Sequence, residues 1–159
     1  MTPVQPLFLT LLGAALIGLM PIAGEAQISV SLPSLEGEPS ELVSIPISTD
    51  DLADLEVLAY SFTIAFDPAV VEITRVSAEG TLSDGMTVVA NTRVPGEVTV
   101  AASSTTPLTG SGILLNLEGS YIGRCVTSLG WSSFLFNEGT PAVTTVAGEA
   151  SVSIGSESG

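Results

Sequence analysis

The chain has 159 residues, of which 45% are hydrophobic and only 13% are charged, and its 17 acidic residues outnumber three arginines with no lysine or histidine. A formal net charge of -14 and a pI of about 4.1 exclude a surface that neutralises a phosphate backbone, so we expect no nucleic-acid partner. The missing residues also exclude Ser-His-Asp and Cys-His nucleophiles, histidine-bound zinc and Schiff-base lysines. The composition therefore predicts a non-enzymatic domain with no catalytic residues and no cofactor.

Residues 1–26 have the pattern of a secretory signal peptide. An apolar run extends from Leu7 to Ile22, and small residues at Gly24 and Ala26 precede a plausible cleavage site before Gln27. The segment before the run lacks Lys and Arg, so a retained membrane anchor is the alternative, but the run is shorter than the about 20 residues that span a bilayer. We expect a secreted or cell-surface protein with no stable membrane association once the signal is cleaved.

The remaining chain contains one cysteine, Cys125, and so cannot form an internal disulfide. We expect Cys125 to be a small core hydrophobe, with an intermolecular bridge as the alternative. Residues 155–159 are expected to form a flexible Ser/Gly tail. Residues 27–154 would then form a single domain held together by its hydrophobic core.

Apolar and polar residues alternate with period two through most of this domain, which is the pattern of half-buried strands. Pro46 lies inside one such segment and suits an edge strand or a bulge, while Asp67-Pro68 ends another. About nine short strands and no convincing amphipathic helix predict an all-β fold, an antiparallel β-sandwich. The expected strands are at 28–32, 43–47, 58–66, 71–76, 86–90, 98–103, 113–121, 129–136 and on both sides of Gly148.

The aromatic residues decide whether a sugar platform is credible. Most of them alternate with apolar residues on a face typical of a core. In the strand at 129–136, the alternation predicts Trp131 on the same face as Leu129 and Leu135, with Phe134 on the opposite face. One of the two rings should then be exposed, so Trp131 is interpreted as core or edge packing, with a sugar platform or partner hot spot as the alternative.

Carboxylates are the only abundant functional group, and they gather in two loops. A glycosidase would need two of them flanking a cleft, and calcium would need an oxygen-rich loop. The spacing around Asp50 does not match an EF-hand, and nothing indicates a cleft. We therefore expect no metal and interpret these acids as solvated turn residues: Asp50, Asp51 and Asp54 in one loop, Glu36, Glu38 and Glu41 in the other.

Several segments resemble the cohesin family. The stretch from Phe66 to Ile73 (FDPAVVEI) is similar to that family's aromatic-Asp-Pro segment after a long apolar strand. In chain order, further similar segments are the glycine and Val-x-Ile-Pro-Ile of 37–47, the Gly-Ser-Gly-Ile-Leu-Leu of 110–115, the Phe-Asn-Glu-Gly of 136–139 and the Gly-Glu-Ala-Ser-Val of 148–152. Together they extend over 28–154.

The resemblance implies a nine-stranded jelly roll and a binding module that docks a dockerin-bearing protein in polysaccharide degradation. It also implies that the partner face is the outward side of the strand that precedes Asp67-Pro68, where cohesins often carry Asn and Asp and this chain has Ala59 and Ser61. A carbohydrate-binding module with a polysaccharide partner, or a structural surface domain, are the alternatives. The expected partner-binding residues are Ala59, Ser61, Thr63 and Ala65 with their neighbours Thr99, Ala101 and Ser103.

Overall fold

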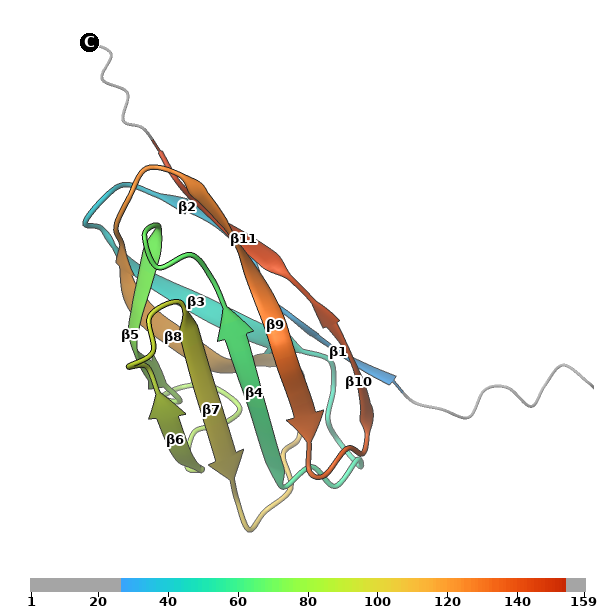
Figure 1. Ribbon diagram of the computed structural model, residues 1–159. Coiled ribbons are helices and arrows are strands. Elements are labelled where there is room, and N and C mark those ends of the chain that lie inside the picture. Colours follow the sequence, from blue (N-terminus) through green and yellow to red (C-terminus); the bar gives the residue numbers. More distant parts are fainter. Residues whose placement is uncertain (1–26, 154–159) are drawn as a thin grey trace, which may run out of the picture.

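The computed structural model describes residues 27–153, which form eleven strands and no helix (Figure 1). The predicted signal peptide and the predicted tail lie outside these residues. The strands are β1 (Gln27–Ser31), β2 (Ser34–Gly37), β3 (Leu42–Thr49), β4 (Ala59–Ala65), β5 (Val71–Ser77), β6 (Thr87–Asn91), β7 (Glu97–Ser103), β8 (Gly112–Tyr121), β9 (Val126–Phe136), β10 (Ala142–Val146) and β11 (Gly148–Val152).

Two sheets face each other and form a sandwich. One has the strand order β10-β1-β3-β8-β5 and the other β2-β11-β9-β4-β7-β6. The predicted all-β sandwich is confirmed. The sheets are mixed rather than purely antiparallel, however, because β1 pairs with β10 and β2 with β11 in parallel.

The structure has more strands than the expected nine, and β2 is the one that matches none of the expected segments; both ends of the domain cross between the sheets. β1 and β2 are separated only by Leu32 and Pro33, and β10 and β11 only by Ala147. The two crossings lie side by side, since the Glu149 amide donates to the Pro33 carbonyl at 3.1 Å. A Cβ on Gly148 would lie 2.0 Å from that carbonyl oxygen, so only glycine allows the strands to approach this closely.

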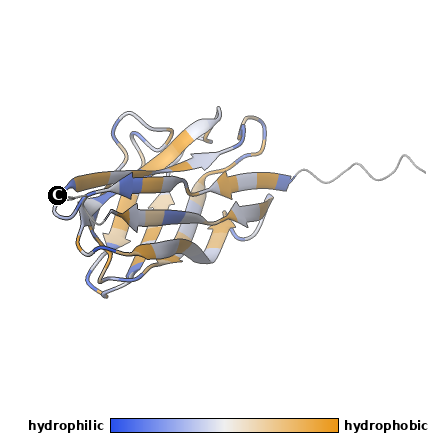
Figure 2. Cartoon of the chain, turned by 90° about the horizontal axis from the view of Figure 1, so that it is seen from above, coloured by the Kyte–Doolittle hydropathy of each residue, from blue (hydrophilic) through white to orange (hydrophobic). Residues whose placement is uncertain are grey.

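The apolar half of each alternating strand fills the space between the sheets. Figure 2 shows hydrophobic and hydrophilic residues following each other along the strands. In β4 the residues Tyr60, Phe62 and Ile64 are each at most 2% exposed. They face Ile45 and Ile47 of β3 across one continuous hydrophobic core. Since successive side chains of a strand point to opposite faces, this burial fixes which residues of β4 face outward.

Of the two places expected for Pro46, an edge strand or a bulge, the structure excludes the edge strand, because β3 lies between β1 and β8 in the sheet. The pairing with β1 covers only Ser48 and Thr49, so no β1 residue lies beside Pro46. A register shift follows directly, between Ile47 and Ser48. The missing amide hydrogen is therefore tolerated in an interior strand because its neighbour is too short to reach it.

The prediction for Cys125 is wrong. This residue is exposed in the turn between β8 and β9 and is not part of the core. Its thiol is free among the residues that the structure describes.

Candidate protein-binding face

The predicted partner residues of β4 and β7 lie together on the outer surface of the six-stranded sheet. Ser61 is opposite Ala101, and Thr63 is opposite Thr99, with their hydroxyl oxygens hydrogen-bonded at 3.1 Å. Ala59 is likewise opposite Ser103. All seven predicted residues are half-buried or exposed. The structure therefore brings them into one surface.

Two strands that sequence reasoning left out extend this surface on both sides. The register places Val89 of β6 beside Ala101 and Leu135 of β9 beside Ser61, so that a single row crosses four strands. Val89 is 66% exposed and Leu135 is 48% exposed. We call the outward residues of these strands, apart from Glu97 at the end of β7, the neutral face: Thr87, Val89, Asn91, Thr99, Ala101, Ser103, Ala59, Ser61, Thr63, Ala65, Ser133 and Leu135.

The neutral face carries no ionisable side chain, although the whole chain carries a net charge of -14. The nearest acid in the same sheet is Glu97, which pairs with Ala65 at one end. Near the other end, around Ala59 and Ser103, the surface is hollowed into a shallow depression of about 330 Å³. The face is thus uncharged, with small residues at its centre and aliphatic side chains on both flanks.

A bulge in β9 explains why the sequence alternation misplaced Leu135. Thr63 pairs with Ser133 and Ile64 with Trp131, which leaves Ser132 as an extra residue without a partner. The bulge reverses the alternation beyond it, so Leu135 faces outward while Trp131 and Phe134 both face the core. The expectation that these two rings lie on opposite faces is wrong.

Trp131 packs at the edge of the core among other aromatic rings. Its ring contacts Phe62 and Phe134 edge to face, with centroids 5.6 and 5.4 Å away. Its indole Nε1–H donates to the backbone carbonyl of Val146 at 3.0 Å. The indole is half-buried and lies on the side of the sheet opposite the neutral face.

Asn137 anchors the end of β4 that begins the neutral face. Its Oδ1 accepts hydrogen bonds from the amides of Leu58 and Ala59 at 2.9 and 3.2 Å. Its Nδ2 donates to the carbonyls of Glu56 and Thr140 at 3.1 and 2.8 Å. The residue has a φ of 52°, a left-handed conformation that Asn tolerates better than most residues. One side chain thus joins the start of β4 to the turn after β9, and the Asn-Glu-Gly turn motif was its only signal in the sequence.

Tyr60 holds the loop between β5 and β6 against the inner side of the same sheet. Its hydroxyl is 2.6 Å from that of Ser83, and both residues are buried. Burial raises the pKa of Tyr60 to about 12, although the bond from Ser83 acts in the opposite direction. The hydroxyl therefore stays protonated at physiological pH and remains paired inside an apolar core.

Two carboxylates of the first acidic loop accept backbone hydrogen bonds, one from β1 and one from within the loop. Asp50 accepts a hydrogen bond from the Ser29 amide at 2.9 Å, and Asp51 accepts one from the Ala53 amide at 2.9 Å. Within residues 27–153, no group of three or more His, Cys, Asp or Glu side chains is placed to hold a metal ion. Nor does any helix there have the length and apolar character needed to cross a membrane.

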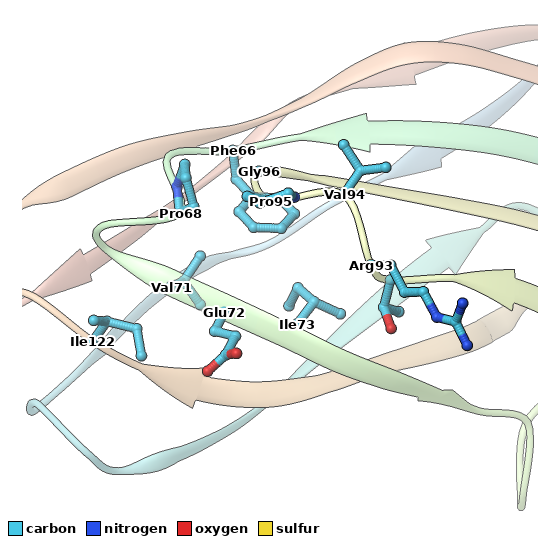
Figure 3. Close-up of a pocket in the computed structure, with 11 residues that line it drawn as sticks. Phe66, Pro68, Val71, Glu72, Ile73, Arg93, Val94, Pro95, Gly96 and Ile122 are labelled. Atoms are coloured by element: carbon cyan, nitrogen blue, oxygen red, sulfur yellow. The ribbon is translucent and has the colours of Figure 1, made fainter.

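A separate cleft of about 370 Å³ lies between β5 and the loop that joins β6 to β7 (Figure 3). Buried Val71 and Ile73 lie beneath it, and exposed Pro68 and Val94 are at its rim. Among its lining residues only Glu72 and Arg93 are charged, and the Arg93 side chain extends away from Pro95 and Phe66. The cleft is mostly apolar and is not part of the neutral face.

The model of the cohesin domain family matches residues 28–152. The chain belongs to the cohesin family. Its fold is similar to a non-cellulosomal cohesin from the hyperthermophilic archaeon Archaeoglobus fulgidus, with a TM-score of 0.68 and 16% identity over 80% of this chain and 91% of that one. Comparison with curated proteins gives no match.

Two further similar structures are cohesins in complex with dockerins. The third cohesin of a scaffoldin from Acetivibrio cellulolyticus has a TM-score of 0.66 and 19% identity, covering 80% of this chain and 99% of that one. A type I cohesin–dockerin complex from Clostridium thermocellum has a TM-score of 0.67 and 12% identity, with the same coverage. At these identities the likeness shows that this cohesin shares their fold.

Proposed function

We propose that this cohesin is an exported, non-catalytic module that docks a dockerin-bearing protein on its neutral face. The observation that carries the proposal is the row Val89, Ala101, Ser61 and Leu135, which is uncharged across four strands. The dockerin complexes of similarly folded cohesins support the choice of partner. Cohesin–dockerin pairing in polysaccharide degradation is the proposed context.

The chemistry of the neutral face suits a partner that approaches closely. Small side chains at Ser61 and Ala101 let a helix lie near the sheet backbone, and no charge has to be stripped of water there. Exposed Val89 and Leu135 would lose water on contact, at about 25 cal/mol for each Å² of apolar surface buried. Hydroxyls at Thr63 and Thr99 supply hydrogen bonds at the edge of the contact, as polar rims do in other interfaces.

Export is part of the proposal and depends on the apolar leader at residues 1–26. Cleavage before Gln27 would separate the domain at 27–154 from this apolar segment. Mass spectrometry of the protein from the culture medium tests this step. A mature amino terminus at Gln27 is the expected result, and a chain that retains residues 1–26 in the membrane fraction would contradict it.

A polysaccharide partner has weaker support because of how Trp131 packs. A stacking platform needs an exposed ring face, whereas this indole contacts Phe62 and Phe134 and bonds to a backbone carbonyl. Quenching of its fluorescence by a neutral solute distinguishes the two roles. We expect weak quenching that added glycan does not change, and strong quenching that glycan relieves would favour the carbohydrate alternative.

Capture from the secreted proteins of the host tests the proposed partner. The purified domain is immobilised and run with calcium or with a chelator, since calcium in such pairs belongs to the dockerin side. The expected result is recovery of a dockerin-bearing protein with calcium only. Recovery of glycan-bound material alone would contradict the proposal, and no specific ligand would favour a structural surface domain.

A further inference from the structure

The free edge of the six-stranded sheet is unusually open. β6 pairs only with β7, and its sequence Thr-Val-Val-Ala-Asn contains no charge and no proline. Exposed edge strands usually carry charges, proline or a bulge that prevent pairing with another strand, and the register of β6 with β7 shows no bulge. A depression of about 370 Å³ follows the end of this edge, along residues 90–93.

The hydrogen bonds of the neighbouring strands show which backbone groups of β6 point outward. Just beyond the paired residues of β4 and β7, the Ser104 amide donates to the Leu58 carbonyl at 2.8 Å. On the other side of β4, where it pairs with β9, the Asn137 amide donates to the Ala59 carbonyl at 2.7 Å. Along an antiparallel pair, every second residue bonds to the partner strand and the residues between bond to the strand on the other side. Since Ser104 bonds towards β4, the even-numbered residues of β7 bond to β4 and the odd-numbered ones bond to β6. Thr87, Val89 and Asn91 therefore bond to β7, and the amides and carbonyls of Val88 and Ala90 point away from the sheet.

We propose that β6 is the docking edge for a second copy of this chain, which adds its own β6 in antiparallel orientation. In the register centred on Val89, Val88 of one copy bonds to Ala90 of the other, and the reverse, which uses the outward groups of both. Val89 then lies directly beside Val89 of the second copy, as a non-hydrogen-bonded pair, where side chains come closest. The pairing buries the most exposed aliphatic side chain of the neutral face and joins the two sheets into one.

The charges next to β6 fit this two-fold arrangement. Arg93 follows the strand and Asp84 precedes it, and both are exposed. Among the described residues, Arg93 has no acidic partner within 4.0 Å. Antiparallel pairing brings Arg93 of each copy to the end of β6 where Asp84 of the other lies, so the contact is complementary at both ends.

The dimer should be weak and favoured by salt. A five-residue edge buries far less than the about 1,200 Å² of a stable interface. Each copy also carries a net charge of -14, and the resulting repulsion is screened at high ionic strength.

The two neutral faces would become adjacent halves of one surface, so a partner with two docking modules would bind more tightly than one with a single module.

Sedimentation velocity and amide hydrogen exchange of the purified protein, without its predicted signal peptide, test the dimer. We expect a monomer at low salt and a concentration-dependent dimer at about 1 M salt, where the screening length is about 3 Å. In the dimer the amides of Val88 and Ala90 gain protection, whereas those of Thr87 and Val89 are protected already in the monomer. A monomer under all conditions, or protection gained elsewhere, would overturn the proposal.

Two variants identify the edge. Ala90→Pro removes an outward amide that β7 does not use, so the monomer should keep its melting temperature within a few degrees while association weakens at least tenfold. Val89→Asp should weaken association similarly, and Leu135→Asp, which adds the same charge at the far flank of the same face, should not. Equal loss with both aspartate variants would show that the copies meet face to face and would refute the edge pairing.

Discussion

The two outer surfaces of the sandwich differ in charge rather than in shape. On the six-stranded sheet, the row through Ser61 contains no ionisable group. On the five-stranded sheet, the row through Ser44 continues to Glu118 and then to Arg75, which form an ion pair. Leu42, in the next row of that sheet, is 83% exposed but shares its row with Glu72.

Exposed aliphatic residues alone therefore do not distinguish the proposed docking surface from the outer surface of the five-stranded sheet. Both surfaces have them, and both are hollowed, by about 330 Å³ on the neutral face and about 430 Å³ beside Leu42. What differs is the cost of removing water, because a carboxylate covered by a partner loses its hydration unless it is paired. The neutral face avoids that cost.

The largest effect is expected from a charge at the centre of the neutral face. Ser61→Asp places a carboxylate under the bound partner, and a buried unpaired charge costs about 2–5 kcal/mol, which weakens binding by roughly 30-fold or more. Ser44→Asp adds the same charge at an exposed position of the other face and should leave the affinity unchanged. Calorimetric titration with the captured dockerin-bearing protein measures both, and similar losses in the two variants would contradict the assignment.

The next effect concerns the support of the neutral face. Asn137→Ala removes four hydrogen bonds and puts alanine in a left-handed conformation, so we expect a loss of about 2–4 kcal/mol in the free energy of unfolding. Asn91→Ala removes a single side-chain bond, to the Arg93 amide, and should cost less than about 1 kcal/mol. Denaturation in urea measures the difference, and equal costs would show that Asn137 is not an anchor.

Alkaline pH should destabilise the protein through Tyr60. Its pKa is raised from 10.0 to about 12, so the folded state holds the proton more tightly than the unfolded chain. The stabilisation is complete below pH 10 and is lost as the pH rises towards 12, by about 2–3 kcal/mol.

Tyr60→Phe should remove most of this pH dependence, at the cost of leaving the Ser83 hydroxyl unpaired. Burial and the charges of Glu41 and Glu36 also raise the pKa of Tyr121, at the end of β8 in the five-stranded sheet. Tyr121→Phe is therefore the matched comparison, and unfolding followed from pH 8 to pH 12 separates the two residues. If the alkaline loss persists in Tyr60→Phe and disappears in Tyr121→Phe, the assignment to Tyr60 is wrong.

The smallest effect should come from the ion pair on the other face. Arg75 and Glu118 have side chains that are 69% and 30% exposed, and exposed pairs contribute about 0–1 kcal/mol. Arg75→Ala should therefore lower the melting temperature by no more than a few degrees and leave partner binding unchanged. A clear loss of binding would show that the partner contacts the five-stranded sheet.

The sequence predicted the parts of the fold that depend on one strand at a time. The alternation of β4 correctly placed Tyr60, Phe62 and Ile64 in the core and Ser61 on the surface. It failed for Leu135, because the bulge at Ser132 is defined by the register with β4 and not by the residues of β9. It also missed Val89, because β6 is too short for its alternation to indicate which side is buried, and the sheet crossings at Pro33 and Gly148 depend on strands that are far apart in the chain.

A methyl-detected NMR titration with the dockerin-bearing partner tests the central claim most directly. The methyl groups of Val89, Ala101 and Leu135 report on the neutral face, and those of Leu42 report on the outer surface of the five-stranded sheet. We expect the first three signals to shift together as partner is added, while the Leu42 signals do not move. Shifts at Leu42 with unchanged signals from Ala101 and Leu135 would contradict it.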